Sequence, residues 1–330
     1  MIESIFRDPK KRIINDKSSV LEGLAYFRNL SSRGLHNLTV SEIQSLKEKY
    51  LKFFNLNLAV WSDTYPTKLF RISNNKNING GLRKKIYKPS DLVAPQTKWT
   101  KLNRCNLPGE RVFYAALDLD TALWETQPKP GDYITISEWK IKEGQHLNTH
   151  YIFDLDNINI SKETRESYHH YLSLKAMVYP NVVDIFEELL KFFSHECRKP
   201  VSQGQEINYL FSALMSSELL QHNPDKKEFR VEAICYPSIK KKYSVTNLAV
   251  INSIVFERLD LVKVTVLEIG ETDFDSSKEE NNLMKVHPIQ VTSTNFDILN
   301  DKIIYDEEDE IRQQRELHYK WLIEENKKWD

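Results

Sequence analysis

The sequence predicts an α+β fold. Strand-like runs rich in β-branched and aromatic residues occupy residues 69–73, 112–117, 133–141, 231–236, 249–258 and 261–269. Two helical patterns lie between them: one opens at Pro180 and ends before Pro200, and the other surrounds Ser212. The strands do not alternate regularly with helices, and the sequence contains no glycine-rich phosphate loop. Both observations disfavour an open parallel Rossmann sheet.

Three zones follow one another along the chain. Residues 1–66 form a predicted helical N-terminal extension, in which TVSE at 39–42 has the spacing of a capping box. Apolar residues then recur on one helical face, namely Ile43, Leu46, Tyr50, Phe53 and Phe54. Residues 67–270 form the predicted α+β body, and residues 271–330 a C-terminal extension. This extension ends in a predicted charged helix with a thin apolar stripe of Ile311, Leu317, Trp321 and Leu322.

Composition excludes several classes of protein. The 330 residues carry 46 Lys and Arg against 47 Asp and Glu, a formal net charge of -1, so the chain has no global basic field to gather nucleic acid or anionic membrane. The N-terminus lacks the apolar core of a signal peptide, and no apolar run approaches the roughly 18 residues of a membrane span. We therefore expect a soluble, cytoplasmic protein without nucleic-acid or membrane partners.

Cysteine and histidine usage argues against a metal site. Cys105, Cys197 and Cys235 are odd in number and widely spaced, which disfavours both a disulfide framework and a cysteine-based zinc site. His146 and His150 lie four residues apart, a metal-binding spacing only if their segment is helical, and no third ligand lies nearby. We expect no bound metal.

Residues 103–125, NRCNLPGERVFYAALDLDTALWE, place an unusual number of polar residues around one short apolar run. A turn at Asn106 leads into a buried strand that contains Tyr114, and Asp118 or Asp120 then caps a short helix that carries Glu125. In the structural interpretation, Tyr114 is a half-buried strand tyrosine and Glu125 is a surface carboxylate. The functional interpretation is a site at one edge of the sheet, with a partly desolvated carboxylate beside apolar neighbours.

Several segments together resemble the RES domain, named for its Arg, Glu and Ser. They are LFR at 69–71, the stretch at 103–125, YLFSALMSSELL at 209–220 and ICYPSIKKKYSVTNLAV at 234–250. In bacteria this domain commonly forms the toxin of a toxin–antitoxin pair, and its characterised members consume NAD. Its fold is similar to that of diphtheria-toxin-like ADP-ribosyltransferases. The resemblance thus implies mixed, mainly antiparallel sheets with flanking helices, NAD as a substrate, and an antitoxin protein as a partner.

The resemblance assigns roles to individual residues. Arg71, Tyr114 and Glu125 match the arginine after the first strand, the strand tyrosine and the glutamate of the family. Arg104 and Asn106 match the arginine and asparagine of the turn. Two residues compete for the serine: Ser238, in a Tyr-Pro-Ser element, and Ser212, in the preceding helix. The resemblance thus predicts a catalytic set of Glu125, Arg71, Tyr114 and Ser238, and NAD contacts from Arg71, Arg104, Asn106, Tyr114 and Ser212.

The chain also departs from the family pattern. Cys105 stands where an aromatic residue is usual, Ala213 where Gln is common, and VEAI at 231–234 replaces a frequent Asp-Gly-Ile. These changes put the geometry of the substrate site, rather than the fold, in doubt.

Cleavage of NAD explains why such residue types belong together. Breaking the nicotinamide–ribose bond releases a neutral base and leaves an oxocarbenium ion on the ribose, so the enzyme needs a placed anion. Glu125 is the candidate anion, while arginines suit the diphosphate because they donate in bidentate pairs. The sequence predicts an NAD glycohydrolase or phosphorylase. The alternatives are an ADP-ribosyltransferase acting on a macromolecule and a non-catalytic protein-binding module that keeps the fold.

Overall fold

The computed structural model describes the chain in segments. These are residues 17–39, 41–43, 45–46, 68–82, 84–152, 155, 162–176, 180–202, 204–221, 230–239, 246–272 and 284–305. The predicted charged terminal helix lies outside the described residues, as do Tyr50, Phe53 and Phe54 of the first apolar face.

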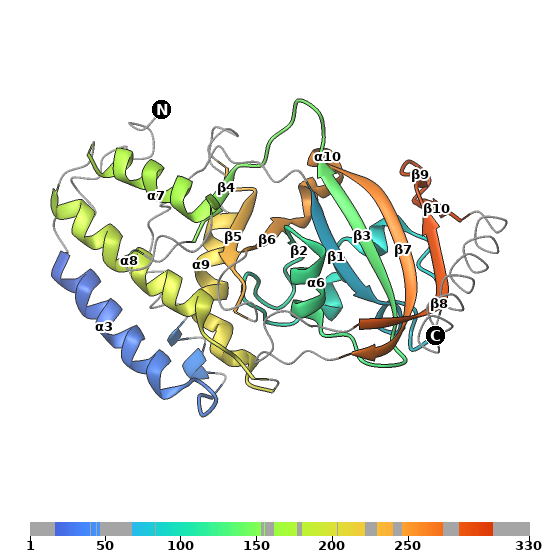
Figure 1. Cartoon of the computed structure of the whole chain (residues 1–330). Helices are drawn as coiled ribbons and strands as arrows, with labels where there is room; N and C mark the ends of the chain where they lie inside the picture. Colours follow the sequence, from blue (N-terminus) through green and yellow to red (C-terminus); the bar gives the residue numbers. More distant parts are fainter. Residues whose placement is uncertain are drawn as a thin grey trace, which may run out of the picture. The chain divides into compact units, whose positions relative to one another are not determined.

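The described residues form a mixed α/β protein with a large, mostly antiparallel sheet (Figure 1). The helices are α3 (Lys17–Arg33), α5 (Asn75–Ile78), α6 (Leu119–Thr126), α7 (Lys162–Lys175), α8 (Pro180–Arg198), α9 (Leu210–Gln221) and α10 (Val255–Arg258). Short 3-10 turns occupy Pro89–Leu92, Thr97–Trp99, Glu206–Tyr209 and Asn252–Ile254. The strands are β1 (Leu69–Asn74), β2 (Val112–Ala116), β3 (Tyr133–Ile141), β4 (Thr149–Tyr151), β5 (Ala233–Pro237), β6 (Thr246–Ile251), β7 (Leu259–Thr272), β8 (Met284–Ser293), β9 (Asn295–Asp297) and β10 (Lys302–Ile304). The predicted α+β class is confirmed at this level.

The chain divides into two compact units that interleave along the sequence. Unit 1 comprises Met1–Tyr65, Gln96–Val112 and Leu147–Ile251, and unit 2 comprises Pro66–Pro95, Phe113–His146 and Asn252–Asp330. This division cuts the predicted 67–270 body at four points, after residues 95, 112, 146 and 251. Residues remote in sequence therefore share a unit, and each unit is best described by itself.

In unit 1, three helices enclose an aromatic core. Phe27 of α3 meets Phe211 of α9 edge to face at 5.3 Å, and Phe192 of α8 contacts the same ring at 5.7 Å. All three side chains are buried. The predicted N-terminal helical region thus packs against helices of the predicted body, because burial of its apolar stripe is what stabilises such a helix. The predicted capping box also forms, with Glu42 accepting from the Thr39 amide at 2.7 Å and donating its own amide to Thr39 Oγ1 at 3.3 Å.

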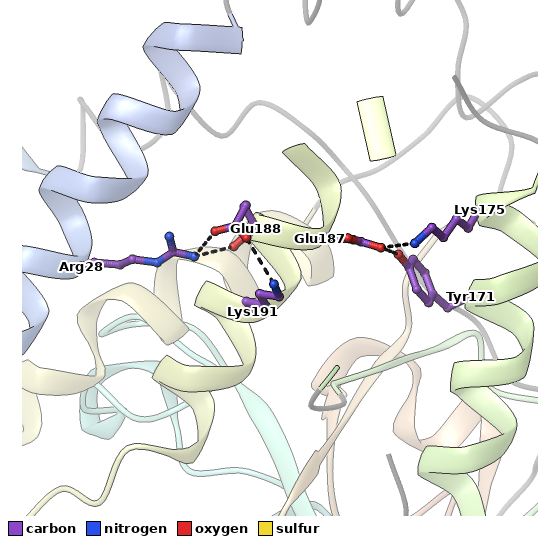
Figure 2. A network of polar contacts seen from close by, with 6 residues as sticks. All are labelled: Arg28, Tyr171, Lys175, Glu187, Glu188 and Lys191. Carbon is purple, nitrogen blue, oxygen red and sulfur yellow. Dashed lines mark hydrogen bonds and ion pairs between the residues drawn. The ribbon is translucent and has the colours of Figure 1, made fainter. Parts of the chain in front are cut away.

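Helix α8 connects its neighbours through two adjacent carboxylates (Figure 2). Glu188 accepts from Arg28 of α3 at 2.8 Å, and Glu187 accepts from Tyr171 and Lys175 of α7 at 2.5 and 2.6 Å. Ion pairs this exposed contribute little to stability, so apolar packing rather than charge holds the helices together. The carboxylates instead fix which face of α8 meets which helix.

Unit 1 also contains the strands β4, β5 and β6. β5 pairs with β6 in antiparallel fashion and with the short β4 in parallel, and every residue of β5 is buried. The sequence pattern extended the strand that contains β6 to residue 258, and this prediction is wrong beyond residue 251. Asn252 and Ser253 open a 3-10 turn and α10 follows, because short polar side chains compete for the backbone hydrogen bonds that would continue a strand.

Unit 2 is built on antiparallel strands in the spatial order β2-β1-β3-β7-β8. One face carries Ile72 of β1, Ile136 of β3 and Ile269 of β7, which pack with Leu119 and Leu123 of α6. The opposite face carries a second aromatic layer, in which Phe113 of β2 meets Trp139 of β3 at 5.3 Å. Strand alternation separates these two sets of side chains.

Candidate active site

Helix α6 carries Glu125, and its sequence explains why it is so short. Asp118 caps its N-terminus, accepting from the Thr121 amide at 2.8 Å and from the Thr121 hydroxyl at 2.7 Å. At the other end Gln127 adopts a left-handed conformation with φ of 44° and donates its amide to Leu123 at 2.7 Å. Of the two capping candidates in the sequence, Asp118 is therefore the cap. The Glu125 side chain is half-buried on the last turn of the helix.

Arg71 lies on β1 and binds the neighbouring strand β2. Its Nη1 donates to the main-chain oxygen of Tyr114 at 2.9 Å, and its guanidinium lies 5.6 Å from the centre of the Phe113 ring. Among the described residues, its buried Nε has no hydrogen-bond partner. Burial lowers the pKa of Arg71 to about 10, and the nearby Tyr114 opposes this shift. The guanidinium remains charged at neutral pH, and its Nε is a buried donor without a partner among the described residues.

Arg71 and α6 lie on different faces of unit 2. Arg71 pairs with Ser137 across β1 and β3, whereas its neighbour Ile72 belongs to the apolar cluster beneath α6. Because successive strand side chains point to opposite faces, Arg71 projects away from the face that α6 covers. The structure thus brings Arg71 to the main chain of Tyr114, and it carries Glu125 on the other side of the sheet.

Arg104 and Asn106 have structural duties in unit 1. The Arg104 side chain is buried, donates to the main-chain oxygen of Cys197 at the end of α8, and stacks on the Tyr209 ring at 4.9 Å. Asn106 donates its amide to the main-chain oxygens of Lys101 and Leu107 at 2.7 and 2.9 Å. These contacts cap a helix and close a turn.

The two candidate serines are also in unit 1, and neither is exposed. Ser212 donates to the main-chain oxygen of Tyr209 at 3.0 Å, a bond within its own helical segment. Ser238 directly follows β5 and is fully buried. The geometry favours neither residue as the family serine.

The seven candidate residues therefore fall into two groups. Unit 2 holds Arg71, Tyr114 and Glu125, and unit 1 holds Arg104, Asn106, Ser212 and Ser238. Convergence of both groups on one NAD molecule stays a prediction.

Sequence reasoning missed several residues that support the candidates. Phe113 lies beneath Arg71, and Tyr209 stacks on Arg104. Glu110 fixes the turn, accepting from the Leu107 amide at 2.8 Å and from Ser217 of α9 at 2.5 Å. Pro108 and Gly109, which precede Glu110, are a readable turn signal, whereas the two ring contacts depend on tertiary packing.

The histidine pair does not share a helix. His150 lies on β4, is buried, and stacks on Phe193 at 5.8 Å, and burial lowers its pKa to about 3. Within the described part of the chain, no group of three or more His, Cys, Asp or Glu side chains is arranged to hold a metal ion. None of the described helices is long and apolar enough to cross a membrane.

No family model matches the chain, and no curated protein sequence is significantly similar to it. What the fold defines is a mixed α/β protein with a large, mostly antiparallel sheet. The resemblance to the RES domain therefore depends only on the four sequence segments at 69–71, 103–125, 209–220 and 234–250.

Proposed function

We propose that the protein is an NAD-consuming enzyme with a RES-type, ADP-ribosyltransferase-like fold, and that it acts in the cytoplasm as a bacterial toxin that depletes NAD. An antitoxin protein is the proposed partner. The observation that carries the proposal is the segment 103–125, in which a strand tyrosine and the carboxylate at the end of a short capped helix recur in the family order. Arg71 is bound to the same strand but lies on the sheet face opposite to α6, and this separation from Glu125 weighs against the proposal.

In the proposed reaction, water or phosphate attacks the anomeric carbon of the nicotinamide ribose. The carbon–nitrogen bond breaks, and its electron pair leaves with neutral nicotinamide. With water the other products are ADP-ribose and a proton, and with phosphate the product is ADP-ribose phosphorylated at that carbon. Glu125 would stabilise the positive charge that develops on the ribose, and a preorganised group of this kind is worth about 3–4 kcal/mol.

The family pattern makes Arg71 the proposed ligand of the diphosphate. An NAD molecule that also reached Glu125 would require a rearrangement, because the Nε that lacks a partner among the described residues is buried on the other face of the sheet. Tyr114 is the proposed stacking partner of nicotinamide. An ADP-ribosyltransferase that uses a macromolecular acceptor would share this first half of the reaction.

One observation favours the non-catalytic alternative, a protein-binding module. The guanidinium of Arg104 binds the end of α8 and stacks on Tyr209, so a residue that the family pattern assigns to NAD has a structural role here. A relic of the fold would keep such a residue for stability alone.

Incubation of the purified chain with NAD, with and without phosphate, followed by separation of the products tests the proposal. We expect release of nicotinamide, with either ADP-ribose or its phosphorylated form as the second product. Transfer of ADP-ribose to an added protein or nucleic acid would identify the transferase alternative. Intact NAD after long incubation at high enzyme concentration would support the binding module.

The same proposal predicts a cellular effect. Production of the intact chain in a bacterial cell should lower the NAD pool and arrest growth. An unchanged NAD level at high soluble expression would count heavily against the toxin.

A further inference from the structure

Strand β7 of unit 2 extends beyond its partner β8. β8 pairs with β7 from Val264 onward, whereas β3 pairs with β7 as far as Leu259. Among the described residues, the stretch 259–263 therefore has a strand on one side only. The outward main-chain groups of this stretch pair with no strand that the structure describes, and an unpaired edge of this kind is a template for an added strand.

A cavity of about 300 Å³ lies along this edge. It is lined by residues 259–262 of β7, by Phe256, and by Phe296 and Ile298 of the β9–β10 hairpin, which lies at the α10 end of β7 (Figure 1). Val262 is the extra residue of a β-bulge, since Glu138 pairs with Lys263 and Trp139 pairs with Leu261. Bulges redirect side chains where pairing ends, and here the bulge coincides with the cavity.

Two aspartates hold the turn of the hairpin beside the cavity by hydrogen bonds, and its tip is apolar. Asp301 has a left-handed φ of 51° and accepts from the Ser90 amide and hydroxyl at 2.9 and 2.6 Å. Asp297 accepts from the amide and side chain of Asn300 at 3.1 and 2.7 Å. The turn so fixed presents Ile298 at 44% exposure and Leu299 at 99%. Ile298 is thus both a lining residue of the cavity and accessible to a partner.

The charges at the cavity favour an acidic partner. Lys140 lies directly opposite Asp260 in the register of β3 and β7. Lys142 is fixed at the cavity wall, where its Nζ donates to the main-chain oxygen of Phe256 at 2.7 Å. The cavity lining thus contains two lysines and one carboxylate, Asp260. A carboxylate of a bound partner would meet net positive charge.

We propose that this edge of unit 2 binds an extended peptide segment of a partner protein by strand addition. The peptide alternates apolar and acidic residues: its main chain pairs with residues 259–263, its apolar side chains fill the cavity beside Phe296 and Ile298, and a carboxylate binds Lys140. This site is independent of the proposed NAD chemistry.

Selection from a displayed library of random peptides against the immobilised full-length chain tests the proposal. We expect enrichment of peptides that alternate apolar residues with Asp or Glu. Synthetic copies of these peptides should bind at least tenfold more weakly to Lys140→Glu and to Ile298→Asp, and equally well to Lys129→Glu. Both test residues line the cavity from exposed positions, and Lys129 is an exposed lysine outside the lining, so all three variants should fold.

Amide hydrogen exchange supplies a measurement specific to strand addition. The bound peptide should slow exchange within residues 259–263, and proline at alternate positions of the peptide should abolish binding, because proline lacks the donor that a strand needs. Failure to enrich any peptide would overturn the proposal. So would equal binding to wild type, Lys140→Glu and Ile298→Asp, or unchanged exchange in 259–263 on saturation with peptide.

Discussion

A change from Glu125 to Gln separates catalysis from folding at the level of one residue. The amide keeps the shape of the side chain but removes the charge that would stabilise the oxocarbenium ion. We expect NAD cleavage to fall about a hundredfold or more, from roughly 3 kcal/mol of lost transition-state stabilisation. NAD binding should fall much less. Product release followed by chromatography measures the rate, and thermal melting shows whether the fold survives.

Glu143→Gln is the matched control for this variant, since Glu143 is an exposed carboxylate in the turn after β3. A Glu125→Gln protein that melts like wild type and still cleaves NAD at the parental rate would exclude Glu125 as the catalytic carboxylate. Substitution of Arg71 should show the opposite balance and weaken binding at least as much as turnover.

A second prediction concerns Glu196 of α8 and the dependence of stability on pH. Its side chain is buried, accepts from Ser31 of α3 at 2.5 Å, and lies 3.9 Å from His195 Nε2. Lys199 donates to the same Ser31 hydroxyl at 2.9 Å. Burial raises the pKa of Glu196 above 4.5, although Ser31, Lys199 and His195 oppose the shift.

The folded chain therefore binds this proton more tightly than the unfolded chain. Its stabilising contribution is fully present below the unfolded pKa, and it is lost as pH rises through the raised folded pKa. Glu196→Gln is neutral throughout, so the free energy of unfolding of wild type should decline relative to that of this variant as pH rises from about 4.5. Urea unfolding at a series of pH values measures the difference.

Glu187 on the same helix supplies a control of opposite sign. Burial raises the pKa of this carboxyl, but hydrogen bonds from Lys175 and Tyr171 outweigh burial, and the net pKa is lowered. The stabilising contribution of Glu187 should be lost as pH falls through the lowered pKa. The difference in free energy of unfolding between wild type and Glu187→Gln should therefore shrink in acid. Identical pH dependence in the two variants would contradict both assignments.

At the level of elements, the position of Glu125 depends on the cap of α6. The helix has only 8 residues, so one cap is a large share of its stability. Asp118→Ala leaves the Thr121 amide without its acceptor and should cost about 1 kcal/mol in the free energy of unfolding. Asp118→Ser, which keeps a capping oxygen, should recover most of this loss. Denaturant unfolding measures both variants, and equal stability of the alanine and serine variants would mean that the cap contributes nothing.

Elements were predictable from the sequence where local signals agreed. β3 was predicted at its observed bounds because β-branched and aromatic residues fill residues 133–141, and α8 followed from the proline at its start. β4 and β9 were missed since each has three residues, too few for any periodicity. The end of β6 was misplaced because apolar residues continue into α10, where the backbone turns at Asn252.

The same limit applies to the candidate site. The resemblance located Arg71, Tyr114 and Glu125 on a strand, a strand and a helix end. It could not foresee that Arg71 and α6 lie on different faces, because sheet face depends on the register of β1 with its neighbours. It also could not foresee that Arg104 would cap α8, since Cys197 lies 93 residues further along the chain.

At the level of the whole molecule, the two interleaved units restrict where the chain can be shortened. The predicted body of residues 67–270 contains most of unit 1 but lacks α3. Leu24 and Phe27 of α3 and Leu35 beyond it are at most 1% exposed, and they pack in one cluster with Phe192 and Phe211. Full burial of each such side chain is worth about 1.5–3 kcal/mol.

A chain that begins at residue 67 should therefore lose unit 1 as a folded unit. The three buried side chains alone would forfeit about 5 kcal/mol or more, which is comparable with the whole stability of many domains. We expect a lower and less cooperative melting transition, and increased binding of the apolar dye anilinonaphthalene sulfonate to the uncovered faces of α8 and α9. Two full-length variants test the same packing at single residues. Phe27→Ala should lower the free energy of unfolding by about 3–5 kcal/mol, whereas Tyr26→Ala should lower it much less, because Tyr26 is 44% exposed. Cooperative melting of the shortened chain at the wild-type temperature would show instead that residues 67–270 form an autonomous domain and that α3 is an appendage.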